Sequence, residues 1–153
     1  MKIFASLLII SALMAASAPT MAQGDPVKVS LSGMARCYKD SQCIRLTIEN
    51  NGSGPVTFGV EGRFRPTIPE PLYTYQFNRQ GTWTDFATSL GTYLAPNRKI
   101  TIKPGQSKNL YVQFSDLSQW SNGDRIRLSI QDASRVMHYT PPFDSSGSPI
   151  SNE

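Results

Sequence analysis

The sequence predicts an all-β protein that folds as a single antiparallel β-sandwich. Short stretches of alternating apolar and polar residues follow one another from residue 27 to residue 140, and clusters of Gly, Pro, Asn and Asp separate them. No convincing helix longer than one turn is evident, and no segment repeats. A corner turn ahead of a strong late strand favours an immunoglobulin-like arrangement, with a small closed β-barrel as the alternative.

Each expected strand ends at a turn signal, and most are rich in β-branched or aromatic residues. In chain order, these strands are Val27–Ser32, Cys43–Glu49, Val56–Val60, Leu72–Phe77, Thr82–Ala87, Ile100–Ile102, Leu110–Phe114, Arg125–Gln131 and Arg135–Thr140. A single helical turn is expected within Ser115–Trp120, where Ser115 or Asp116 would cap it.

Three hairpins are expected among these strands. Pro104-Gly105 suits the centre of a type II turn, so Arg98 to Phe114 is predicted to form one β-hairpin around it. The turn at Asn78–Gly81 predicts a second hairpin, from Tyr73 to Ala87. The partner of the strand at Cys43–Glu49 is expected to precede the loop between the two cysteines.

The amino terminus has the features of a secretory signal peptide. Lys2 precedes an apolar run from Ile3 to Ala16 that is too short to span a bilayer, and small residues lead to a cut after Ala22. We therefore expect a signal peptide at 1–22, a sandwich domain at 23–143 and a disordered tail at 144–153. The style of the signal indicates a bacterial protein that is periplasmic or secreted, without stable membrane insertion after cleavage.

The charge and the cysteines restrict the function further. The net charge is +4 at pH 7, and the basic residues are scattered along the chain, so no nucleic-acid partner is expected. Cys37 and Cys43 should pair in an oxidising compartment, where so small a ring would stabilise the fold by about 2 kcal/mol. Their spacing is not Cys-x-x-Cys, which argues against a redox or metal pair.

No catalytic signature is present. The chain has one histidine, His138, and lacks a Gly-x-Ser-x-Gly motif, so a hydrolase triad is not expected. One histidine and two paired cysteines cannot supply the usual ligand set of a transition metal, and no glycine-rich phosphate loop is present. We therefore expect neither a metal nor a cofactor. Two carboxylates that folding brings together could still act on a glycan.

The proline-rich segment Glu61–Pro71 is the most informative place for function. It carries Arg63, Phe64, Arg65 and Ile68 on a stiff connection that loses little entropy on binding, and arginine and aromatic residues are types that anchor interfaces. We interpret these four residues as a partner-binding surface. The alternative is a loop folded over the sandwich edge, with Phe64 and Ile68 capping the core.

A second hypothesis concerns the aromatic residues Tyr73, Tyr75 and Trp83. Exposed, they would form a stacking platform for sugar rings, whereas alternation on a strand is also typical of a sandwich core. The sequence thus favours a small exported binding module that presents loops to another envelope or secreted protein, as an inhibitor, an immunity factor or an assembly factor. A carbohydrate-binding module and a glycan-acting enzyme with paired carboxylates are the alternatives.

Overall fold

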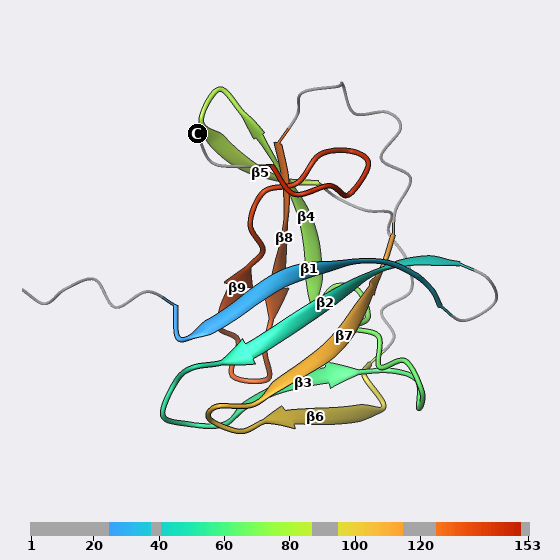
Figure 1. The fold of residues 1–153 in the computed structure, drawn as a ribbon, viewed down its shortest axis with the longest axis vertical. Coiled ribbons are helices and arrows are strands. Elements are labelled where there is room, and N and C mark those ends of the chain that lie inside the picture. The colour runs from blue at the N-terminus through green and yellow to red at the C-terminus, as the bar shows by residue number, and fades with distance from the viewer. Residues whose placement is uncertain (1–24, 38–40, 87–94, 115–124, 151–153) are drawn as a thin grey trace, which may run out of the picture.

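The fold is all-β in a computed structural model that describes residues 25–37, 41–86, 95–114 and 125–150 (Figure 1). The described strands are β1 (Val27–Arg36), β2 (Gln42–Asn50), β3 (Val56–Val60), β4 (Tyr73–Arg79), β5 (Thr82–Phe86), β6 (Arg98–Ile102), β7 (Ser107–Gln113), β8 (Arg125–Gln131) and β9 (Met137–Tyr139). Within these ranges no helix is long and apolar enough to cross a membrane.

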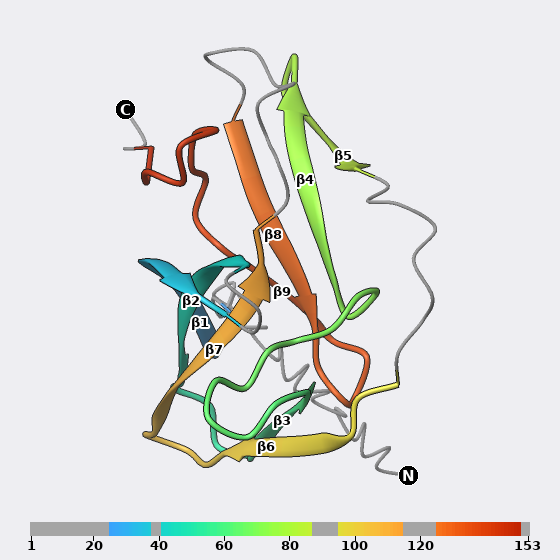
Figure 2. The same ribbon diagram turned by 90° about the vertical axis from the view of Figure 1, so that its right-hand side faces the viewer.

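The strands form antiparallel sheets that pack face to face. One sheet has the order β1-β2-β7, the other has the order β5-β4-β8-β9, and β3 pairs with β6 in a two-stranded ribbon. Figure 2 shows the first sheet opposite β4 and β8, with the β3–β6 ribbon across the lower end. The sheets are not closed into a barrel. All the strand pairs are antiparallel and the arrangement is compatible with a β-sandwich, so the predicted fold class is confirmed.

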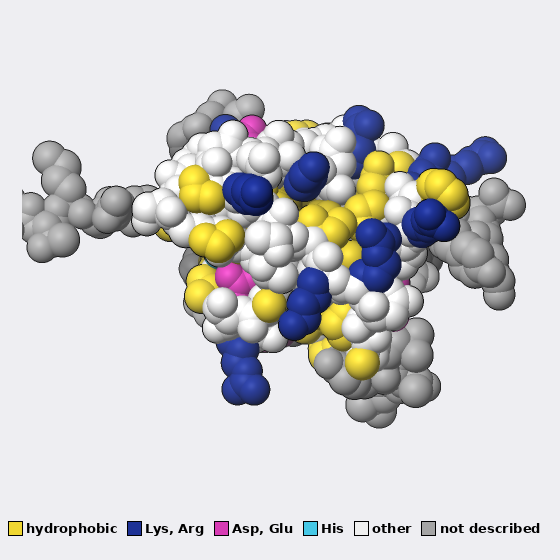
Figure 3. Space-filling view, turned by 90° about the horizontal axis from the view of Figure 1, so that it is seen from below, with side chains coloured by type: hydrophobic (Ala, Val, Ile, Leu, Met, Phe, Trp, Pro, Cys, Tyr) yellow, Lys and Arg dark blue, Asp and Glu magenta, His cyan; other side chains and the backbone are white. Residues whose placement is uncertain are grey.

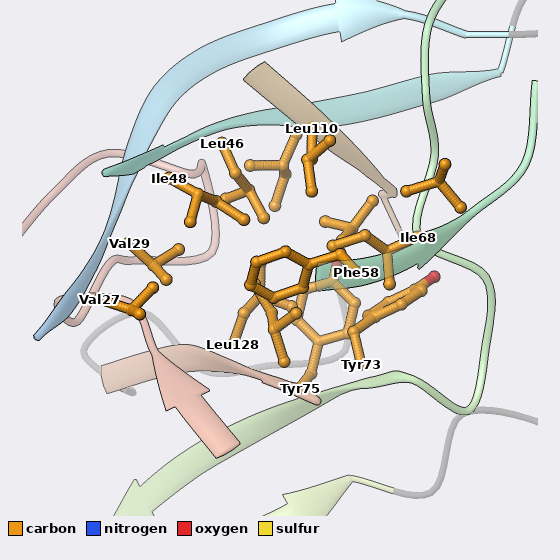
Figure 4. Close-up of a cluster of buried hydrophobic side chains, with 14 of the residues drawn as sticks. Val27, Val29, Leu46, Ile48, Phe58, Ile68, Tyr73, Tyr75, Leu110 and Leu128 are labelled. Atoms are coloured by element: carbon orange, nitrogen blue, oxygen red, sulfur yellow. The ribbon is translucent and has the colours of Figure 1, made fainter. Parts of the chain in front are cut away.

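The core lies between the two sheets because alternate residues of each strand point inward. Leu46 and Ile48 of β2 face Tyr75 and Leu128 of the opposite sheet, and Phe58 of β3 fills the space between them (Figure 4). All five side chains have no exposed surface. Burying each aliphatic side chain of this size contributes about 1.5–3 kcal/mol, so this layer supplies much of the driving force for folding.

Two of the expected hairpins are confirmed. β1 pairs with β2 on either side of the disulfide loop, and the Cα atoms of Cys37 and Cys43 lie 5.8 Å apart within the bridge. β4 pairs with β5 through Gln80 and Gly81, whose φ angles of 53° and 87° match a two-residue type I′ turn. The disulfide is compatible with an oxidising compartment outside the cytoplasm.

The expected hairpin from Arg98 to Phe114 is wrong, although its turn is right. The N–H of Gln106 donates to the carbonyl of Lys103 at 3.0 Å and Gly105 has a φ of 73°, as a type II turn requires. However, β6 pairs with β3 and β7 pairs with β2. The turn instead docks on the end of β2, where the Gly105 N–H donates to the Asn50 carbonyl at 2.8 Å, so the chain passes from one sheet to the other.

The first part of the expected disordered tail makes defined contacts. The carboxylate of Asp144 accepts the backbone N–H groups of Ser146 and Ser148, which closes a tight turn. The N–H of Ile150 then donates to the carbonyl of Pro142 at 3.0 Å. This differs from the prediction because a short polar turn needs little apolar burial when one side chain satisfies its backbone. The predicted signal peptide and the helical turn at 115–120 lie outside the described residues.

Candidate functional site

The predicted binding segment forms a small closed loop at the end of β3. Glu61 and Thr67 exchange two backbone hydrogen bonds, N–H of Glu61 to the Thr67 carbonyl at 2.7 Å and N–H of Thr67 to the Glu61 carbonyl at 2.9 Å. The five residues between them, 62–66, are called the tip loop below. A loop closed by paired backbone groups has few alternative conformations, so its side chains are held in place before any partner arrives.

The base of the tip loop is anchored to strand β7. The N–H of Ile68 donates to the carbonyl of Tyr111 at 2.7 Å, and the N–H of Tyr111 donates to the carbonyl of Pro66 at 3.0 Å. This pairing covers part of the free edge of β7 and turns Ile68 inward, where only 1% of its surface is exposed. Ile68 is therefore a core residue, and its assignment to the binding surface is corrected.

Side-chain hydrogen bonds also hold the backbone of the tip loop. The guanidinium of Arg98 in β6 donates to the Gly62 carbonyl at 2.7 Å, and the hydroxyl of Thr67 donates to the Arg65 carbonyl at 3.1 Å. Gly62 has a φ of 77°, and a Cβ added there would lie 3.0 Å from the Arg65 carbonyl oxygen. Only glycine fits this position without strain.

The tip loop presents an apolar residue between two cations. Phe64 is 92% exposed, the largest exposure among the large exposed hydrophobic residues that the structure describes. Arg63 and Arg65 on either side are exposed too, and neither guanidinium lies within salt-bridge distance of a carboxylate in the described part of the chain. The structure thus brings three of the four predicted residues together on one exposed surface.

A groove lies beside the tip loop. Its volume is ≈ 580 Å³, which falls within the usual range for ligand sites in proteins. The disulfide hairpin forms one wall with Cys37, Ser41 and Cys43, and residues 61–65 with Thr67 form the other. Asn97 and Gln113 also line it. Local sequence patterns do not reveal this groove because its two walls are far apart along the chain.

The aromatic platform predicted from Tyr73 and Tyr75 is wrong. Their side chains are only 3% and 0% exposed, and both hydroxyls donate to the carbonyl of Gln113, at 3.4 Å and 2.8 Å. Burial, followed by the charge of the nearby Glu70 carboxylate, raises the pKa of the Tyr73 hydroxyl far above its ordinary value, so this group stays a donor. The tyrosines belong to the core because β4 lies in the middle of its sheet.

Trp83 takes part in a different aromatic arrangement, on the outer face of the four-stranded sheet. The guanidinium carbon of Arg127 lies 4.2 Å from the ring centroids of both Trp83 and Tyr139. Arg127 Nε also donates to Gln76 Oε1 at 2.8 Å. Local sequence patterns do not single out Arg127 and Tyr139. Their outward positions on β8 and β9 are the only signal, and placing them beside Trp83 requires the strand register.

His138 is buried between two carboxylates. Its Nδ1 lies 3.1 Å from Asp25 Oδ2, its Nε2 lies 3.3 Å from Asp132 Oδ2, and its ring lies 5.8 Å from that of Phe58. Asp132 in addition accepts the N–H groups of Ser134 and Val136. With both ring nitrogens engaged and 2% of the residue exposed, His138 is placed to join β9 to the start of β1 and to the β8–β9 turn.

Within the described ranges, no three His, Cys, Asp or Glu side chains gather in a way that could hold a metal ion. Among the exposed residues of the tip loop, Arg63 and Arg65 can donate hydrogen bonds and Phe64 can offer an apolar contact. No protein-family model matches the chain, and comparison with curated proteins gives no match.

Proposed function

We propose that this protein is a small exported binding module that presents the tip loop to another protein of the envelope or secreted space. The observation that carries the proposal is Phe64, 92% exposed at the end of a loop that backbone hydrogen bonds close. A large apolar side chain costs free energy when it is left in water, and a partner that buries it recovers that free energy. Inhibitor, immunity factor and assembly factor are the roles that such a surface suits.

The flanking cations support the same function. Arginine and aromatic residues dominate the binding energy of protein interfaces, and Arg63 and Arg65 surround the phenylalanine with donors suited to carboxylates or carbonyls. Because the loop is held in shape by Arg98 and Thr67, little conformational entropy is lost when it binds.

The test is a pull-down from envelope extract with the full chain purified after export, run beside Phe64→Ala and the double variant Arg63→Ala, Arg65→Ala. Val136→Ala is the matched control, because Val136 is also an exposed apolar residue but lies in the β8–β9 turn. We expect a retained protein that is lost with Phe64→Ala and kept with Val136→Ala. Retention of the same proteins by Phe64→Ala would contradict the proposal.

The export step has its own test. Mass spectrometry of the purified chain should show an amino terminus at Gln23, with the protein recovered from the periplasm or the medium. A chain that keeps residues 1–22 in the cytoplasm would contradict export.

A further inference from the structure

The groove between the disulfide hairpin and the tip loop has two walls, and bonds within the fold hold the described residues of each. On one side the bond between Cys37 and Cys43 closes the hairpin, and the Cys37 N–H donates to the Ser41 carbonyl at 2.7 Å. On the other side the tip loop is closed by Glu61 and Thr67. A site between two closed loops exists before the ligand binds, which reduces the cost of binding.

The charges that line the groove are unbalanced. Arg63 and Arg65 have no carboxylate within salt-bridge distance among the described residues, and Glu61 is the only acidic residue in the lining. A further cation, Arg98, donates a hydrogen bond to the carbonyl of Gly62 at the base of the loop. On the face that Figure 3 shows, Lys and Arg side chains are spread widely and Asp and Glu are few. The groove therefore favours a ligand with negative charge.

The lining also has an apolar part. Phe64 and the two cysteines contribute apolar surface next to the arginines. A small anion would leave this surface in water. A membrane surface would need several apolar side chains together, whereas Phe64 is the only large exposed hydrophobic residue on the described part of this loop. A peptide segment that alternates acidic and apolar side chains satisfies both features.

We propose that this groove binds an extended acidic segment of a partner protein, with an apolar side chain of that segment against Phe64 and its carboxylates on Arg63 and Arg65. The inference rests on the proposed function and adds the chemistry of the partner. It also assigns a binding role to the disulfide hairpin, as the second wall of the site.

The test uses an array of short synthetic peptides of random sequence, probed with the exported full chain, followed by measurement of Kd in solution for the peptides retained. We expect enrichment of peptides in which Asp or Glu flanks an aromatic or aliphatic residue, and a Kd that rises with NaCl concentration. The double variant Arg63→Glu, Arg65→Glu should weaken binding by at least about tenfold, because two attractive pairs become repulsive.

The control carries the same change of charge elsewhere. Lys103 and Lys108 lie in the β6–β7 turn and at the start of β7, outside the lining of the groove. Lys103→Glu, Lys108→Glu should therefore change Kd by less than about twofold. Equal weakening by the two double variants would mean that net charge alone attracts the peptides, and would overturn the groove as the site.

Two further outcomes would overturn the inference. One is an array that selects no acidic motif; the other is binding to phosphatidylglycerol vesicles that depends on Arg63 and Arg65 while no peptide binds. If Phe64→Ala abolishes capture of a protein but the array selects no acidic motif, the groove inference fails and the proposed function stands. If Phe64→Ala captures the same proteins as the original chain, the proposed function fails as well.

Discussion

The ionisable side chains beyond the two ends of strand β1 differ in whether they have partners. Ahead of its start, Asp25 joins Asp132 in enclosing the buried His138, and all three groups are paired. Past its other end, beyond Cys37, Arg63 and Arg65 are exposed, and neither lies within salt-bridge distance of a carboxylate in the described chain. Removing one partner of a paired group that is buried, such as His138 or Asp132, is costly, whereas exposed unpaired cations add almost nothing to folding. The first region therefore has a structural role, and the second is the surface that we propose for a partner.

The first prediction tests whether burial of Ile68, and not the exposed residues of the tip loop, stabilises this end of the molecule. Ile68→Ala removes a side chain that is 1% exposed and leaves a cavity, so we expect it to lower the free energy of unfolding by about 3 kcal/mol. Urea denaturation followed by tryptophan fluorescence measures this. Phe64→Ala is the matched variant, and it should change stability by less than about 0.5 kcal/mol. Equal losses from the two would mean that Phe64 packs against the fold.

The second prediction concerns the cluster of Asp25, Asp132 and His138. Asp132→Ala removes the acceptor for two backbone N–H groups and for His138, and should lower the free energy of unfolding by about 2 kcal/mol. Asp132→Asn keeps an acceptor oxygen and should lose less. Stability unchanged in Asp132→Ala would show that this cluster does not hold the strands.

The third variant tests whether the tip loop is held in one shape. Gly62→Ala places a Cβ against the Arg65 carbonyl at a positive φ, and should cost about 1 kcal/mol together with weaker capture of the partner. Gly54→Ala is the control, since a Cβ there meets nothing within 4 Å. Full binding by Gly62→Ala would argue that the loop need not be preformed.

The fourth prediction concerns the unpaired cations themselves. Arg63→Ala, Arg65→Ala should change the free energy of unfolding by less than about 0.5 kcal/mol while it weakens partner binding, because neither guanidinium has a carboxylate partner in the described fold. Thermal unfolding and the pull-down, run on the same preparation, separate the two effects. A marked loss of stability would mean that these arginines contribute to folding, which would contradict the prediction.

The smallest effect comes from an acidic group that is paired only with its own turn. The side-chain hydrogen bond from Ser146, and then the N–H of Ser148, lower the pKa of Asp144 below its ordinary value of 3.8. Its contribution is therefore fully present above that value and is lost as the pH falls through the lowered pKa. Asp144→Asn should loosen the turn at pH 7, as seen by hydrogen exchange, but should match the original chain in strong acid. A difference that persists in acid would contradict this.

Turn chemistry explains why one predicted hairpin formed and another did not. Gln80 and Gly81 form a type I′ turn, whose twist matches that of paired strands, and β4 pairs with β5. Pro104 and Gly105 form a type II turn, which splays the strands it joins, and β6 and β7 enter different sheets. Both turns can be predicted from their residues in the sequence. The partners of β6 and β7 depend on β3 and β2, which lie far away along the chain.

The candidate site shows the same limit within one segment. Arg63, Phe64, Arg65 and Ile68 were assigned to one surface because one stiff segment carries all four, and the alternative placed both Phe64 and Ile68 against the core. The pairing of residues 66–68 with Tyr111 of β7 decided that Ile68 would turn inward and Phe64 would not. That register is set by a strand more than forty residues later, so local pattern could not separate the two.

The sequence by itself determined which residues form strands, where most turns lie, and that Cys37 and Cys43 close a short hairpin, because alternation, turn residues and a short disulfide loop are local properties. Only the tertiary structure decided which strands share a sheet, that Tyr73 and Tyr75 are buried, and that a groove separates the disulfide hairpin from the tip loop. Burial and concavity depend on surfaces brought together from distant parts of the chain, and no window of sequence contains both surfaces.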